Sequence, residues 1–115
     1  MTDVDAQLDA AFAALAHPAR RQILASLAKG EATVTDLAEP FDISLPAVSN
    51  HIRVLEKAGL ITRGRNAQFR PCRMNFDRLK VVVDWSEAYR QIWEARFDRM
   101  DSIIEAKREE SDDGR

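Results

Sequence analysis

The sequence has few of the features that stabilise secreted proteins or anchor membrane proteins. Cys72 is its single cysteine, so no disulfide can form within the chain and nothing favours an oxidising compartment. The longest apolar runs, such as Val81 to Val83, are far shorter than a membrane span. The N-terminus is acidic, unlike the basic and then apolar start of a signal peptide. We therefore expect a cytoplasmic protein with no membrane partner.

Patterns that carry enzyme chemistry are also missing. The chain has no glycine-rich phosphate loop, no serine nucleophile motif and no cluster of histidine and glutamate ligands. Its 115 residues suit one small globular domain rather than an enzyme with two domains and a deep cleft. A metal site built from His17, His51 and Cys72 requires a coincidence of geometry, because the two histidines fall in different predicted helices. We expect no enzyme activity, no metal and no cofactor.

A helix with a capping signal at each end is predicted at residues 44–58. Val48, Ile52 and Leu55 fall at helical spacing and form one apolar stripe. Ser44 is placed to cap the N-terminus, and Gly59 stands where a left-handed residue ends a helix. The opposite side carries the residues Pro46, Asn50, Arg53 and Lys57. This helix is expected to pack with one side and to offer the other to a partner.

A short hairpin is predicted after this helix, over residues 60–74. Its strands are expected at 60–62 and 69–74, because both segments favour extended structure. The segment 63–68 between them is polar and contains Gly64 and Asn66, which favour a turn. Several arginines fall in this hairpin, so we expect a basic tip.

The charges of the chain are segregated. The whole chain has a net charge of −2, which by itself argues against a nucleic-acid partner. Residues 44–78, however, hold seven lysine or arginine residues and two acidic residues, a net charge of +5, so the remainder carries −7. A locally positive surface on an otherwise acidic protein is suited to binding a polyanion.

Three further helices are predicted before residue 44. The first covers residues 4–15, the second begins at Pro18, and the third follows a capping-box start at 33–36 and ends at Pro40. The short link at 41–43 has the length expected in a helix-turn-helix. These helices are expected to support the helix at 44–58.

Two helices are expected after the hairpin. Asn75 is placed to cap a short helix that ends near Val83, and a longer amphipathic helix is expected at 84–108. The longer one extends about 37 Å at 1.5 Å per residue, more than a small domain can cover with its own core. We therefore expect a homodimer. Residues 111–115 are expected to form a disordered tail. The expected dimer contacts are Leu8, Phe12, Leu15, Trp85, Tyr89, Ile92, Trp93, Phe97, Met100 and Ile104.

Two features have an alternative explanation. Trp85, Tyr89 and Trp93 could line an apolar ligand pocket between protomers, although a plain dimer core is favoured. Cys72 could sense oxidants if its arginine neighbours lower its pKa, although a role in packing is favoured. No effector is identified by these patterns.

The runs ALAHPARRQIL and AVSNHIRVLEKAGLI resemble the ArsR/SmtB family of dimeric winged-helix transcriptional repressors. The resemblance implies a mainly α fold with a small β-hairpin, a winged helix-turn-helix domain at 1–110. Within it, the resemblance implies a recognition helix at 44–58, a wing at 60–74 and a dimerisation helix at 84–108. The long N- and C-terminal helices would form the dimer.

The sequence departs from the metal-sensing members of this family. Arsenic and cadmium sensors carry a Cys-x-Cys pair where this chain has Thr33 to Leu37 without a thiol. Zinc and nickel sensors place histidines on the terminal helix, and this chain has none there. The resemblance is therefore to a branch without the metal-binding motifs.

The expected partner is double-stranded DNA. The helix at 44–58 is expected in the major groove and the hairpin along the minor groove or flanking phosphates. The expected contacts are Ser44, Ala47, Ser49, Asn50, His51, Arg53, Lys57, Arg63, Arg65, Asn66, Gln68 and Arg70. Together with the expected dimer, these contacts predict a homodimeric repressor that binds a palindromic operator. Regulation of its own gene is an option. The alternative is a winged-helix module that binds protein rather than a specific DNA sequence.

Some residues of this basic surface have two possible roles. Arg53 could bind a guanine or a phosphate, and His51 could touch the DNA backbone or pack within the protein. Arg20 and Arg21 lie at a helix N-terminus, where cations oppose the helix dipole, so either a phosphate partner or a surface salt bridge would explain them.

Overall fold

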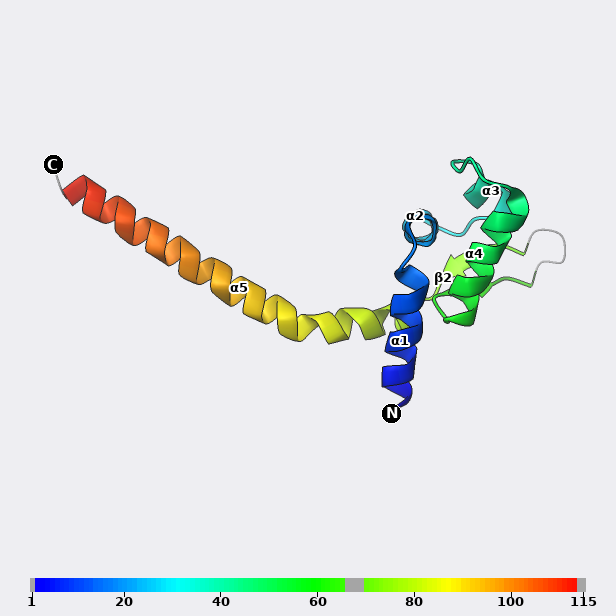
Figure 1. Ribbon diagram of the computed structural model, residues 1–115, viewed down its shortest axis with the longest axis horizontal. Helices are drawn as coiled ribbons and strands as arrows, with labels where there is room; N and C mark the ends of the chain where they lie inside the picture. Colours follow the sequence, from blue (N-terminus) through cyan, green and yellow to red (C-terminus); the bar gives the residue numbers. More distant parts are fainter. Residues whose placement is uncertain (1, 66–69, 114–115) are drawn as a thin grey trace. The chain divides into compact units, whose positions relative to one another are not determined.

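The computed structural model describes residues 2–65 and 70–113 of the chain. Residues up to Val82 form one compact unit, and residues from Val83 onward form a second. Within the described residues the elements follow in the order α1 (Asp3–Leu15), α2 (Pro18–Leu27), α3 (Val34–Ala38), α4 (Leu45–Lys57), β1 (Ile61–Arg63), β2 (Cys72–Met74) and α5 (Phe76–Asp113) (Figure 1). The fold is therefore mainly helical with one small hairpin, as the sequence predicts.

Side chains at the helix N-termini explain where the helices begin. The hydroxyl of Ser44 accepts a hydrogen bond from the amide of Ala47 at 3.3 Å, which caps α4. Thr33 and Asp36 form the reciprocal capping box predicted for α3. His17 precedes Pro18 in extended backbone, and its Nδ1 accepts from the amide of Ala19. The first two caps are confirmed predictions, whereas the cap at His17 is a finding of the structure.

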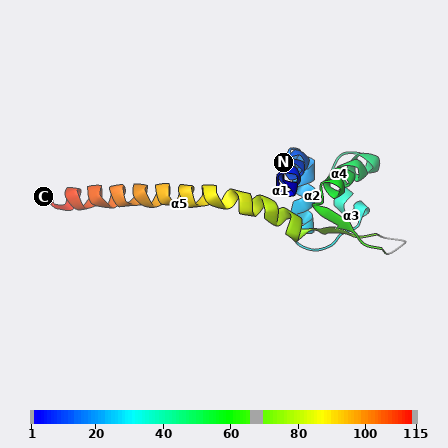
Figure 2. The same cartoon turned by 90° about the horizontal axis from the view of Figure 1, so that it is seen from below.

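The core of the first unit lies around α4. Helices α1, α2 and α3 all pack on α4 (Figures 1 and 2). The predicted stripe of Val48, Ile52 and Leu55 is fully buried, with at most 1% of each residue exposed. The other buried apolar residues are Ala11, Ala14, Ile23, Leu24, Leu27, Leu37, Ala58, Leu60, Ile61 and Cys72. The orientation of α4 about its own axis is therefore fixed by packing.

The strands of the hairpin differ from their predicted bounds: β1 (Ile61–Arg63) lies one residue later than predicted, and β2 (Cys72–Met74) is shorter. β1 and β2 pair antiparallel, with Ile61 opposite Met74 and Arg63 opposite Cys72. β2 begins at Cys72, because Pro71 has no amide hydrogen to continue the ladder, and residue 69, where the predicted strand starts, lies outside the described residues. Ala32 forms a further bridge with Cys72, which ties the hairpin to the segment before α3.

The end of the chain differs from its prediction. Where a short helix to Val83 and a separate helix at 84–108 are expected, α5 is one helix of 38 residues from Phe76 to Asp113. The sequence has no glycine or proline near Asp84 to interrupt it. Residues 111–113, expected in a disordered tail, are helical, and residues 114–115 lie outside the described part.

Asn75, just before α5, and Arg78, in the first turn of α5, cap the C-terminal end of α4. The side-chain Nδ2 of Asn75 donates to the carbonyl of Gly59 at 2.9 Å, and Nη1 of Arg78 donates to the carbonyl of Ala58 at 3.2 Å. Gly59 has a φ of +82° and lies so close to Arg78 that a Cβ there would clash with the guanidinium group. The cation of Arg78 also favours the negative end of the α4 dipole. Two elements separated by the hairpin are therefore joined at this point.

Replacing Asn75 tests this junction. We expect Asn75→Ala to lower the free energy of unfolding by about 1 to 3 kcal/mol, because both the bond to Gly59 and the cap on the amide of Arg78 are lost. Asn75→Asp keeps the capping oxygen and loses the donor, so it should fall between Asn75→Ala and wild type. Urea unfolding at one protein concentration measures the difference. An unfolding midpoint of Asn75→Ala equal to that of wild type would show that the junction contributes nothing.

Candidate nucleic-acid interface

The side of α4 opposite its buried stripe is polar and accessible. Asn50, Arg53 and Lys57 are exposed there, on the helix that Val48 and Ile52 hold against the core. Because residues three and four apart share one face of a helix, these side chains form a single row. An amide and two cations in one row can donate hydrogen bonds to base edges and phosphates.

The N-terminal turn of α4 carries small side chains beside this row. Ser44 is exposed, although its hydroxyl already accepts from the amide of Ala47. Ala47 and Ser49 are half-buried. These three small side chains allow close approach of another molecule to the backbone at their positions, whereas Leu45 and Pro46 beside them are larger and exposed.

His51 lies between the exposed row and the core. It is half-buried, and its ring centroid lies 4.4 Å from that of His17 at the start of α2. Burial, followed by the charges of His17 and Arg20, lowers the pKa of His51. His51 is therefore a partly packed residue, one of the two alternatives that the sequence left open.

The predicted wing residues have different surroundings. Arg65 and Arg70 are exposed. Arg63 is half-buried, and its Nε donates to the carbonyl of Arg70 at 3.2 Å, so this side chain holds the hairpin together. Asn66 and Gln68 lie outside the described residues, and their roles stay predictions.

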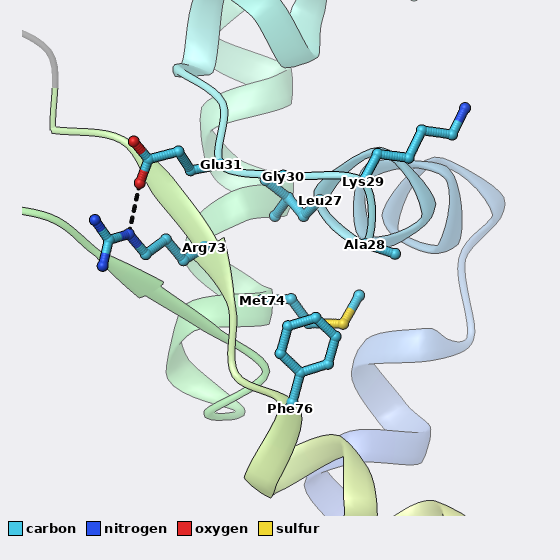
Figure 3. A pocket seen from close by; sticks show the side chains of 8 residues that line it. All are labelled: Leu27, Ala28, Lys29, Gly30, Glu31, Arg73, Met74 and Phe76. Carbon is cyan, nitrogen blue, oxygen red and sulfur yellow. Dashed lines mark hydrogen bonds and ion pairs between the residues drawn. The ribbon is translucent and has the colours of Figure 1, made fainter.

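Two other arginines of the basic segment bind groups of the protein. Arg73 pairs through Nε with Glu31 Oε2 at 2.6 Å, and this pair joins β2 to the segment after α2 (Figure 3). Arg78 caps α4, as described above. Neither partner was evident from the sequence, because Glu31 and Arg73 are 42 residues apart and Arg78 reaches back 20 residues.

A hollow lies beside the Glu31–Arg73 pair. It has a volume of about 300 Å³. Met74 and Phe76 face the end of α2 across it, while Lys29 points away (Figure 3). The lining is mostly apolar, and the basic groups of the α4 row are not part of it. It is therefore separate from the polar row of α4.

Cys72 belongs to the core. Its thiol is fully buried, and burial raises its pKa although Arg63 and Arg70 act in the opposite direction. A buried thiol of raised pKa is a poor nucleophile. The packing role favoured by the sequence accounts for its position.

The expected dimer residues fall on α1 and on the second unit. On α1, Leu8 is half-buried, Leu15 packs against the core of its own chain, and Phe12 is exposed. Within the second unit, Trp93 and Phe97 form an exposed aromatic pair with ring centroids 5.6 Å apart. The other expected residues of this helix are likewise exposed: Trp85, Tyr89, Ile92, Met100 and Ile104.

Metal binding and insertion into a membrane are two other functions that the described residues can be tested for. No group of three or more histidine, cysteine, aspartate or glutamate side chains in the described ranges could hold a metal ion. In the same part of the chain, no helix is both long enough and apolar enough to cross a membrane. The expected lack of a metal site stays a prediction.

Comparison with known proteins places this geometry in a family. A family model described as a helix-turn-helix domain matches residues 15–64, which include α2, α3 and α4. The transcriptional repressor SdpR of Bacillus subtilis is 38% identical over 74 residues, which cover 64% of this chain and 82% of that protein.

Solved structures agree with this match. The crystal structure of an ArsR-family transcriptional regulator has 39% sequence identity and a TM-score of 0.69, and the match covers 76% of this chain and 97% of that one. A homodimeric winged helix-turn-helix DNA-binding domain from Mycobacterium bovis has 26% identity and a TM-score of 0.61, with 80% and 91% of the two chains covered. The chain belongs to the ArsR/SmtB family of winged helix-turn-helix transcriptional regulators, which are not enzymes.

Proposed function

We propose that this protein is a homodimeric transcriptional repressor that binds a palindromic operator, including one upstream of its own gene. The observation that carries the proposal is the exposed row of Asn50, Arg53 and Lys57 on a helix whose other side is fully buried. A helix of 13 residues with the small side chains of Ala47 and Ser49 near its start fits the major groove. The name of SdpR as a transcriptional repressor supports the same function.

In this proposal the row and the hairpin have different tasks. Asn50 is suited to pair with adenine through two hydrogen bonds, and Arg53 with guanine or with a phosphate. Arg65 and Arg70 of the hairpin, both exposed, follow the minor groove or the phosphates beside it. The remaining proposed contacts are Ser44, Ala47, Ser49, His51, Lys57, Arg63, Asn66 and Gln68.

The second unit supports the dimer in this proposal. Trp93, Phe97 and Met100 each expose more than half of their surface, and they recur at helical spacing with Ile104. A face of this kind is normally covered by another apolar face. Covering it with the same helix of a second copy brings two α4 helices to one duplex, related by a dyad. Half-sites about 10 to 10.5 bp apart are then expected.

Fluorescence anisotropy with the DNA upstream of the gene tests the DNA-binding function. We expect specific binding whose affinity falls steeply with salt, because about 0.9 counterions are released for each neutralised phosphate. A shuffled duplex of equal composition is the control. Absent binding, or binding that salt does not weaken, would instead favour a winged-helix module that binds protein.

Arg53 and Arg73 offer a matched comparison. We expect Arg53→Ala to weaken operator binding by about 1 to 3 kcal/mol, because a direct contact is lost. Arg73→Ala should change binding little, since that side chain pairs with Glu31. Anisotropy on operator variants also separates the two roles of Arg53, as loss of preference at one base pair indicates a base contact and uniform weakening indicates a phosphate contact. Equal effects of the two substitutions would contradict the proposed orientation of α4.

The dimer is tested by placing one charge on either side of α5. We expect Trp93→Glu to shift the protein towards monomer in analytical ultracentrifugation, because it puts a carboxylate on the apolar face. Gln91→Glu puts the same charge on the polar side of the helix and should leave the dimer unchanged. Circular dichroism verifies that both variants keep their helix content. A Trp93→Glu protein that remains dimeric would exclude this face as the interface.

A further inference from the structure

Apolar side chains are exposed at the start of α4. Ile43 and Leu45 have 44% and 49% of their surface exposed, and Pro46 is exposed as well. Ser44 is the one polar residue among residues 43–46. Single exposed apolar residues are common on protein surfaces, whereas three among four consecutive residues form a patch. We call Ile43, Leu45 and Pro46 the 43–46 patch.

The 43–46 patch is separate from the core of the first unit. Ile43 and Leu45 belong neither to the buried core nor to the partly buried residues packed against it. Among the described residues of the first unit, the other large apolar residues that are exposed lie on α1 and α5: Val4, Phe12 and Phe76. Packing within the protein therefore does not account for the apolar residues at the start of α4.

The patch continues the polar row of α4 towards the N-terminus of the helix. Pro46 lies four residues before Asn50 and seven before Arg53, positions that share one face of a helix. Leu45 lies four residues before Ser49. In helix-turn-helix domains, residues near the N-terminus of the recognition helix contact base edges. With the polar row in the major groove, Leu45 and Pro46 therefore face the bases.

The start of α4 has little capacity to bind phosphate. Pro46 has no amide hydrogen. The amide of Ala47 donates to the hydroxyl of Ser44, and the amide of Val48 donates to the carbonyl of Ser44 at 3.1 Å. The sequence has no lysine or arginine between Lys29 and Arg53. This end of the helix therefore offers DNA an apolar surface in place of charge.

Thymine is the base that matches such a surface. In the major groove guanine, cytosine and adenine present hydrogen-bond donors and acceptors, whereas thymine also presents its C5 methyl group. Burying a methyl group against an apolar side chain removes both from water and is favourable. An apolar patch at the base edges therefore favours a thymine over the other three bases.

We propose that Leu45, with Pro46 beside it, packs against the C5 methyl group of a thymine in each operator half-site and so determines part of the sequence specificity. The inference rests on the proposed function, because it requires α4 in the major groove. It adds the identity of a base: a thymine faces the start of α4 in both half-sites, at positions related by the dyad. The contact is apolar and involves no exchange of protons.

Replacing thymine by deoxyuridine in the operator tests the contact, because deoxyuridine pairs with adenine in the same way and lacks only the methyl group. The thymines of the half-sites are replaced one position at a time, symmetrically in both half-sites, and binding is measured by fluorescence anisotropy. For wild type we expect one position at which affinity falls about fourfold for each methyl group removed. All measurements use the full chain at one salt concentration.

Variants of Leu45 assign this effect to its side chain. Leu45→Ala should weaken binding to the thymine operator and should bind the thymine and deoxyuridine operators equally at that position. Leu45→Met keeps an apolar side chain of similar size and should keep the preference for thymine. Val4→Ala shortens an exposed apolar side chain of α1 and should leave both affinities unchanged. Circular dichroism verifies that the variants are folded.

The outcomes separate this inference from the proposed function. If no position responds to deoxyuridine, or if Leu45→Ala shows the same thymine preference as wild type at every position, the inference is wrong and the proposed function is intact. Weaker binding of Leu45→Ala with an unchanged preference would likewise overturn it, because Leu45 would then act on the helix and not on the base. Failure of every duplex to bind would overturn both.

Discussion

The burial of one side of α4 is the constraint on which the rest of the structure depends. Val48, Ile52 and Leu55 are sealed against α1, α2 and α3, so the helix cannot rotate about its axis without exposing them. Its opposite side must then present Asn50 and Arg53 to solvent. The caps hold the two ends of the same helix, with Ser44 at the start and side chains of α5 at the finish. The orientation of the polar row follows from packing and needs no partner to set it.

This packing also changes how the basic segment at 44–78 is understood. Composition alone suggests that seven cations are offered to a polyanion. Three of them also bind groups of the protein: Arg63 closes the hairpin, Arg73 pairs with Glu31 and Arg78 caps α4. Each of these contacts fixes part of the hairpin or of α4. The other four cations of the segment, Arg53, Lys57, Arg65 and Arg70, are exposed.

Much of the fold could be predicted because it depends on local patterns. The cap at Ser44, the left-handed Gly59 and the stripe of α4 each follow from residues within one or two helical turns. What the sequence did not provide depends on contacts across the fold: the His17–His51 stack and the Arg78 cap join residues 34 and 20 positions apart. The break expected at Asp84 was wrong, because an acidic residue inside a helix does not interrupt it.

The central claim is that the outward row of α4 occupies the major groove at two half-sites. Dimethyl sulfate footprinting tests it most directly, because the reagent methylates guanine N7, which lies in that groove. The account predicts protected guanines in two half-sites about one helical turn apart, and loss of this protection with Asn50→Ala and Arg53→Ala together. Tight binding with no protected guanine N7, or protection unchanged by that double substitution, would contradict the account.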